Sequence, residues 1–130
     1  MNLSFELVLI GKMLLASLLT YILGKEREVS KKPIGIRTTI LIGCATTLFS
    51  SIAAGTESYF IFIGVISGIG FLGGGVIMKE EGRVTGLTTA ALIWMIAAIG
   101  ICIGLDFYLT AILSTFLSFL ILKSKKFKLG

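Results

Sequence analysis

Residues 87–122 read LTTAALIWMIAAIGICIGLDFYLTAILSTFLSFLIL, and this stretch decides the fold. It carries a single charged residue, Asp106, and as one continuous helix it would be roughly 54 Å long. The hydrocarbon core of a bilayer is only about 30 Å thick, so the stretch has to reverse once. Gly104 and Asp106 favour a tight turn, because both tolerate turn backbone conformations, and Asp106 would then face water. We therefore predict two antiparallel membrane helices over residues 87–103 and 105–122.

Three further apolar runs of similar length occupy residues 3–23, 36–54 and 59–78. Of the 130 residues 55% are hydrophobic and 15% are charged, and the mean hydropathy is +1.01. A soluble domain would leave too much of this apolar surface in water. No Lys or Arg precedes the first run, so we expect it to be retained and not cleaved as a signal peptide. The sequence predicts one all-α membrane domain, residues 1–130, with about five transmembrane helices and no β-structure.

Basic residues fall on one side of this five-helix arrangement. Eleven of the twelve do so: Lys25, Arg27, Lys31, Lys32, Arg37, Lys79, Arg83, Lys123, Lys125, Lys126 and Lys128. Because cytoplasmic loops are enriched in Lys and Arg, the N-terminus is predicted outside and the C-terminus in the cytoplasm. The net charge of +5 is then explained by this asymmetry and by attraction to anionic lipid, so nucleic acid is not an expected partner.

The twelfth basic residue, Lys12, lies inside the first predicted helix. An ionisable group at that depth is costly unless it is paired, hydrated or able to reach the interface. Helical spacing places Ala16, Leu19 and Thr20 on its face, which favours a functional role. The alternative is that Lys12 extends outward to lipid phosphate.

The second predicted helix carries a polar stripe. Thr39, Gly43, Thr46 and Ser50 follow one another at i, i+4, i+7 and i+11 and share one helical face. The stripe, with Thr46 at its centre, could line an ion path. It could equally pack against a neighbouring helix with its hydroxyls bonded to carbonyls.

The third predicted helix is rich in glycine. Its glycines are Gly64, Gly68, Gly70, Gly73, Gly74 and Gly75, and they include two G-x-x-x-G pairs. This pattern is typical of close helix packing or dimerisation, although the run of residues 73–75 could also open the helix. A dinucleotide motif is excluded because no strand precedes the glycines.

The first cytoplasmic loop concentrates charges of both signs. Arg27 and Arg37, the latter followed by Thr38, could clamp a phosphate or carboxylate. Glu26 and Glu28 could offer oxygen ligands to Mg²⁺. Histidine is absent from the sequence, which argues against a zinc site. The alternative is a solvated anchor held by internal ion pairs.

The second cytoplasmic loop adds Glu80 and Arg83. They precede a helix whose N-terminus we expect Thr85 or Thr88 to cap. The positive end of that helix would attract anions.

Four blocks of sequence together resemble the N-terminal membrane region of the MgtC/SapB family. They are GKERE (24–28), KPIGIRTTILIG (32–43), SGIGFLGGGVI (67–77) and GLTTAALIWMIAAIG (86–100). The resemblance implies a multi-pass protein of the bacterial inner membrane. Some members are linked to growth at low magnesium, acid tolerance or restraint of the proton-driven ATP synthase.

The resemblance also implies which positions matter. Those that match the family pattern are Lys12, Glu26, Arg27, Arg37, Thr38, Gly68, Gly70, Gly73, Gly86, Thr88, Thr89 and Trp94. Three family positions before and within the third helix differ, where this chain has Glu57, Phe60 and Gly64. The cytoplasmic C-terminal domain of many members is expected to be missing, since the sequence ends at Gly130.

These features lead to one hypothesis and two alternatives. The hypothesis is a non-enzymatic, homo-oligomeric membrane protein without a cofactor, which affects magnesium or proton homeostasis or regulates a membrane partner such as the ATP synthase. The first alternative is a small oligomeric ion channel or transporter, for which Lys12 and the glycine-rich helix would suit an anion such as fluoride. The second is an enzyme acting on lipid head groups through the loop charges, although no catalytic nucleophile with an adjacent base is evident.

Overall fold

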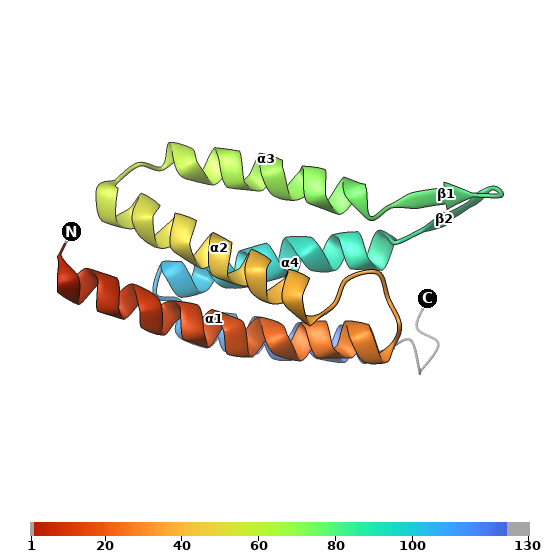
Figure 1. Ribbon diagram of the computed structural model, residues 1–130, viewed down its shortest axis with the longest axis horizontal. Coiled ribbons are helices and arrows are strands. Elements are labelled where there is room, and N and C mark those ends of the chain that lie inside the picture. The colour runs from red at the N-terminus through yellow and green to blue at the C-terminus, as the bar shows by residue number, and fades with distance from the viewer. Residues whose placement is uncertain (1, 125–130) are drawn as a thin grey trace.

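The computed structural model describes residues 2–124 as a bundle of five helices with one small β-hairpin (Figure 1). In chain order the elements are α1 (Leu3–Val29), α2 (Ile36–Thr56), α3 (Phe60–Gly75), β1 (Met78–Glu80), β2 (Arg83–Thr85), α4 (Leu87–Gly104) and α5 (Tyr108–Lys123). The five predicted helices are thus confirmed. Three of the basic residues predicted to lie on the cytoplasmic side, Lys125, Lys126 and Lys128, are outside the described residues.

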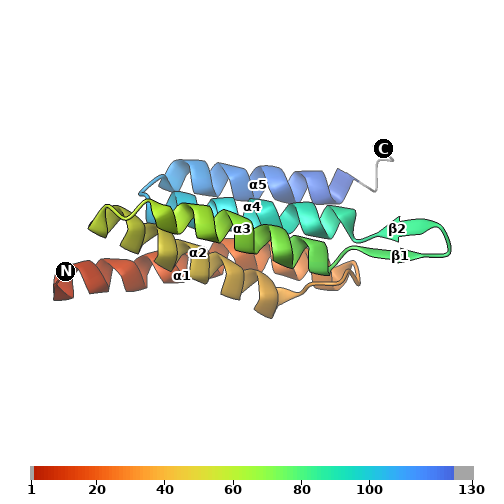
Figure 2. The same ribbon diagram turned by 90° about the horizontal axis from the view of Figure 1, so that it is seen from above.

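The predicted reversal between the last two helices is also confirmed. α4 ends at Gly104 and α5 begins at Tyr108, and α5 runs back alongside α4 (Figure 2). Asp106 adopts a left-handed backbone conformation with φ of 70°, and the N–H of Phe107 donates to the carbonyl of Cys102 at 2.7 Å. This short connection closes the turn that the length argument required.

The first helix is longer than predicted. α1 continues to Val29 instead of ending at residue 23, so the charges of residues 25–28 lie on a helix and not in a loop. Gly24 does not end the helix, because the four residues that follow it, 25–28, all have high helix propensity. Gly24 instead allows close packing of α1 on α2, since a Cβ there would lie 2.7 Å from the Cα of Ile36.

The expectation of no β-structure is wrong for the connection between α3 and α4. β1 pairs antiparallel with β2 in the register Met78↔Thr85, and α3 ends at Gly75 instead of residue 78. Glu81 and Gly82 both have positive φ, 49° and 78°, which is the two-residue turn that matches the twist of a hairpin. The hairpin extends beyond the helix ends, where its backbone hydrogen bonds need no packing partner (Figure 1).

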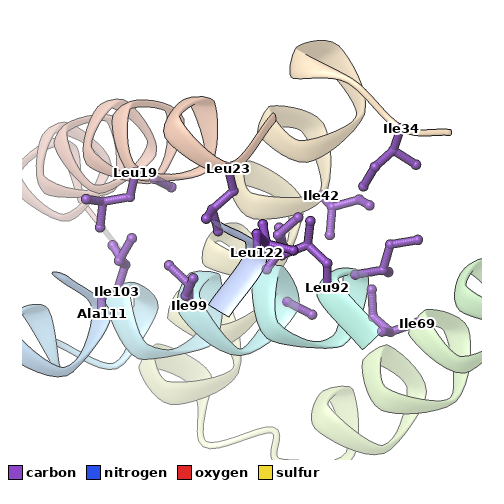
Figure 3. Close-up of a cluster of buried hydrophobic side chains, with 14 residues drawn as sticks. Leu19, Leu23, Ile34, Ile42, Ile69, Leu92, Ile99, Ile103, Ala111 and Leu122 are labelled. Atoms are coloured by element: carbon purple, nitrogen blue, oxygen red, sulfur yellow. The ribbon is translucent and has the colours of Figure 1, made fainter. Parts of the chain in front are cut away.

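The core lies where α1, α2 and α4 meet. Figure 3 shows its aliphatic side chains, which include Leu19, Leu23, Ile42, Leu92, Ile99 and Ile103. By contrast, α3 buries only Ile69 and Gly73 and exposes large apolar side chains such as Phe60 and Phe71. The bundle therefore has a packed interior and an apolar exterior.

An apolar exterior of this size suits lipid as the solvent. By length and composition α1, α2 and α4 can each cross a membrane, while α3 and α5 are apolar helices of 16 residues each. The chain is a membrane protein.

Candidate functional site

Lys12 forms an ion pair at the end of the bundle where α4 turns into α5. Its Nζ lies 2.8 Å from Oδ1 of Asp106 and donates to the carbonyl of Gly104 at 3.0 Å. The Lys12 side chain is only 10% exposed, so it faces protein and does not extend to lipid phosphate. The hydroxyl of Tyr108 also donates to Asp106, at 2.9 Å. The sequence alone did not identify Asp106 as the partner of Lys12, from which it lies 94 positions away in the chain.

Asp106 itself remains open to solvent, as predicted, with 68% of its side chain exposed. The hydrogen bond from Lys12 is the largest of the effects that hold the pKa of Asp106 below its ordinary value, followed by the hydrogen bond from Tyr108. The Asp106 carboxylate therefore stays ionised and anchors α1 to the α4–α5 turn.

The hydroxyls of α2 are bonded to backbone carbonyls of α2 and α4. Between the helices, Thr47 donates to Gly100 at 3.1 Å and Ser51 donates to Gly104 at 3.2 Å. The predicted stripe residues make mostly local bonds, for example Thr46 to the carbonyl of Ile42 at 3.0 Å. This arrangement fits the packing interpretation of the stripe.

The contacts between α2 and α4 depend on glycine. A Cβ at Gly104 would lie 2.8 Å from the carbonyl oxygen of Thr47, and a Cβ at Gly100 would lie 2.6 Å from that of Gly43. The predicted packing glycines of α3 behave differently. At Gly64, Gly68, Gly74 and Gly75 an added Cβ would meet nothing within 4 Å, while at Gly70 and Gly73 it would meet Trp94 and Ala90 of α4 at ordinary contact distance.

An apolar groove lies between α2 and α3. It has a volume of about 520 Å³ and is lined by residues that include Leu41, Phe49, Gly64 and Gly68. The open glycines thus border a groove and are not packed within this chain.

Glu26 and Arg27 form a buried ion pair at the opposite end of α1. Their side chains are 3% and 4% exposed, and Nη2 of Arg27 lies 2.8 Å from Oε1 of Glu26. Ser30 donates to Oε2 of Glu26 at 2.7 Å, and Nη1 of Arg27 donates to the hydroxyl of Thr89 at 3.4 Å. This cluster connects α1 to the first turn of α4, so the alternative of a solvated anchor does not describe these two residues.

Beside Arg27 lies a cavity of about 880 Å³, at the end of the bundle that carries the α1–α2 connection and the hairpin. Its lining comes from α1, the α1–α2 loop, β2, the start of α4 and the end of α5: Arg27, Lys31, Lys32, Pro33, Val84, Thr85, Gly86, Leu87, Thr88, Thr89, Ile121, Leu122 and Ser124. We refer to it as the basic cavity. Three of the predicted functional residues, Arg27, Thr88 and Thr89, line it.

The N-terminus of α4 opens onto the basic cavity without the predicted hydroxyl cap. Gly86 is the N-cap residue, with φ of 86°, and no side chain caps the helix. Thr85 donates instead to the carbonyl of Met78 across the hairpin, at 3.4 Å. A side chain at position 86 would collide with the carbonyl of Val76, so only glycine fits this turn.

The other predicted residues are dispersed. Arg37 and Thr38 are exposed on α2, and Arg37 is not among the residues that line the basic cavity, so Arg27 and Arg37 do not form a clamp. Glu80 and Arg83 face each other in the register of the exposed hairpin.

The two carboxylates considered for magnesium have separate partners. Glu28 accepts from the N–H of Ile36 at 3.1 Å, whereas Glu26 is held by Arg27 and Ser30. Within residues 2–124 no three His, Cys, Asp or Glu side chains come together as a metal site would require.

Comparison with known proteins gives one consistent family. A model of the MgtC family matches residues 13–128. The chain is 41% identical over 106 residues to Protein MgtC of Salmonella typhimurium, covering 79% of this chain and 46% of that protein. It is 33% identical over 116 residues to Protein SapB of Bacillus subtilis, covering 79% and 50%.

A protein of Haemophilus influenzae is 37% identical over 124 residues, covering 85% of this chain and 52% of that protein. The chain thus spans about half the length of the curated relatives it matches. No solved structure gives a significant match.

Proposed function

Because the chain belongs to the MgtC family, we propose that it is a non-enzymatic protein of the bacterial inner membrane that affects magnesium or proton homeostasis. It does so by regulating a membrane partner, such as the ATP synthase, and not by conducting ions itself. The N-terminus lies outside and the C-terminus in the cytoplasm. The grouping of the basic loops at one end of the bundle supports this orientation (Figure 1).

The observation that carries the proposal is the pairing of polar groups inside the bundle. Within residues 2–124 every buried side-chain nitrogen and oxygen has a hydrogen-bond partner. An ion pathway needs oxygens that can replace the hydration shell of the ion, or a water-filled passage. The hydroxyls of Thr47 and Ser51 are instead bonded to α4, and Lys12 is paired with Asp106. Such an interior supports a rigid bundle whose outer faces recognise other proteins.

The face proposed for recognition is that of α3. This helix buries few of its own side chains, and its open glycines Gly64 and Gly68 border the groove on α2. Open glycines let a second helix approach closely, which suits packing against another copy of the chain. Gly68→Leu should convert an oligomer to a monomer in cross-linking, whereas Gly11→Leu, at an equally open glycine of α1, should not.

Two measurements test regulation against conduction. In proteoliposomes the purified chain should give no flux of Mg²⁺ or H⁺ above that of empty liposomes. In inverted membrane vesicles that contain the ATP synthase, added chain should lower ATP-driven proton pumping, and the synthase should co-purify with it. Flux that disappears in Lys12→Ala and Thr46→Val would instead establish the channel or transporter.

A further inference from the structure

The charged side chains that line the basic cavity are all basic. Arg27, Lys31 and Lys32 all line it, and no Asp or Glu is among the described residues that do so. The carboxylate of Glu26, which pairs with Arg27, also accepts a hydrogen bond from Ser30. The lining therefore favours an anion over a cation or a neutral ligand.

Arg27 keeps donor capacity for a ligand although it is almost fully buried. A guanidinium has five N–H groups. Within residues 2–124 Glu26 accepts from Nε and pairs with Nη2, and Thr89 accepts from Nη1 through a long bond of 3.4 Å. Each terminal nitrogen thus retains one further N–H, and Arg27 is one of the residues that line the cavity.

The start of α4, which Arg27 contacts through Thr89, adds further donors. α4 has 18 residues, and its N-cap Gly86 offers no side chain to its first turn. The N–H groups of Leu87, Thr88 and Thr89 accordingly make no hydrogen bond to a capping side chain, and the hydroxyls of the two threonines lie beside them. Helix N-termini of this kind carry a partial positive charge that favours anions.

We propose that the basic cavity binds a phosphate group, held by Arg27, Lys31 and the first turn of α4, all of which line it. Several donors from different elements suit a tetrahedral group with several oxygens better than a planar carboxylate, which one guanidinium can satisfy. The volume of about 880 Å³ exceeds the need of an inorganic ion and leaves room for an organic portion. Leu87, Ile121 and Leu122 provide an apolar wall for that portion.

Two sources can supply this chemistry: a soluble phosphate compound of the cytoplasm, or the phosphate of an anionic lipid head group. The inference goes beyond the proposed function, which stands whether or not the cavity binds phosphate.

Calorimetry of the full chain in neutral detergent with inorganic phosphate tests the soluble source. The lipid source is tested in nanodiscs made of phosphatidylcholine with or without phosphatidylglycerol, by native mass spectrometry of the lipid that stays bound. Arg27→Lys keeps the charge but loses the forked donors of the guanidinium, so it should lower the affinity for the probe roughly tenfold. Lys31→Gln and Thr88→Val should each weaken it several-fold.

Lys25→Gln is the matched control. Lys25 is an exposed basic residue of α1 near the same loop, but it does not line the basic cavity, so this variant should bind within about twofold of the wild type. Lys31 and Thr88 are exposed, so their variants keep the test valid if Arg27→Lys fails to fold. The proposal is overturned if neither probe binds the wild type, or if Lys25→Gln weakens binding as much as Lys31→Gln does.

Discussion

Gly100→Ala should loosen the contact between α2 and α4. The new Cβ would lie 2.6 Å from the carbonyl oxygen of Gly43 and 3.0 Å from the Cβ of Thr46. Both contacts are with α2, one of them with its backbone, so relief requires the helices to separate. Separation also stretches the bond of 3.1 Å from the Thr47 hydroxyl to the carbonyl of Gly100.

The expected loss of unfolding free energy follows from the steric overlap and the stretched hydrogen bond. Overpacking of a close contact costs about 1–3 kcal/mol. An interhelical hydrogen bond in a membrane protein contributes roughly 0.6 kcal/mol. Gly11→Ala is the control, because a Cβ at Gly11 in α1 would meet nothing within 4 Å and both changes gain the same helix propensity. The free energy of unfolding of Gly100→Ala should therefore lie about 2–4 kcal/mol below that of Gly11→Ala.

The assay is reversible unfolding in mixed micelles with increasing ionic detergent, followed by far-UV circular dichroism. A difference between the two variants of less than about 0.5 kcal/mol, within the ordinary spread of surface substitutions, would show that the helices do not meet through Gly100.

Three further predictions address the other contacts. Asp106→Asn should lower the thermal midpoint near neutral pH. Because the pKa of Asp106 is lowered in the folded chain, the stabilisation by its carboxylate is present above the unfolded pKa and is lost as pH falls through the folded pKa. The thermal midpoints of wild type and variant should therefore begin to converge below about pH 4 and meet only below the folded pKa. A constant difference down to lower pH would contradict the ion pair with Lys12. Arg27→Met should cost about 3–5 kcal/mol of unfolding free energy, because it leaves Glu26 buried and unpaired, and the double variant with Glu26→Gln should recover part of this loss in a double-mutant cycle. Gly86→Ala should destabilise by at least about 1–2 kcal/mol through its left-handed backbone alone, and an unchanged unfolding midpoint would refute the turn described here.

The number of helices could be predicted because it depends on local quantities. Residues 87–122 contain one charge in a stretch too long for a single span, and bilayer thickness then requires the turn at Asp106. The same reasoning was wrong at helix ends, where neighbours decide. Gly24 is compatible with either a helix end or a helix crossing, and only the approach of Ile36 makes it the latter.

The pairing of Lys12 could not be predicted from spacing along its own helix. Its partner Asp106 and its acceptor Gly104 lie more than ninety positions away, and no periodicity connects them. The sequence does indicate that Lys12 needs a partner, because a buried unpaired cation is costly. Asp106 is the one charged residue in the turn between α4 and α5. The hairpin was missed for a related reason, since its three-residue strands are too short to show alternation and depend on the turn at Glu81 and Gly82.

The two ion pairs bear on which part of the bundle can respond to a partner. Lys12 holds α1 to the turn after α4, and Arg27 holds the other end of α1 to the start of α4, so these two helices are joined at both ends. α2 is joined to α4 along its length by Thr47 and Ser51. Within residues 2–124 no side-chain hydrogen bond or ion pair joins α3 to another helix, and the residues that α3 buries are Ile69 and Gly73. A displacement of α3 would therefore break no side-chain hydrogen bond or ion pair to another helix, and the hairpin connects α3 to Gly86 at the wall of the basic cavity.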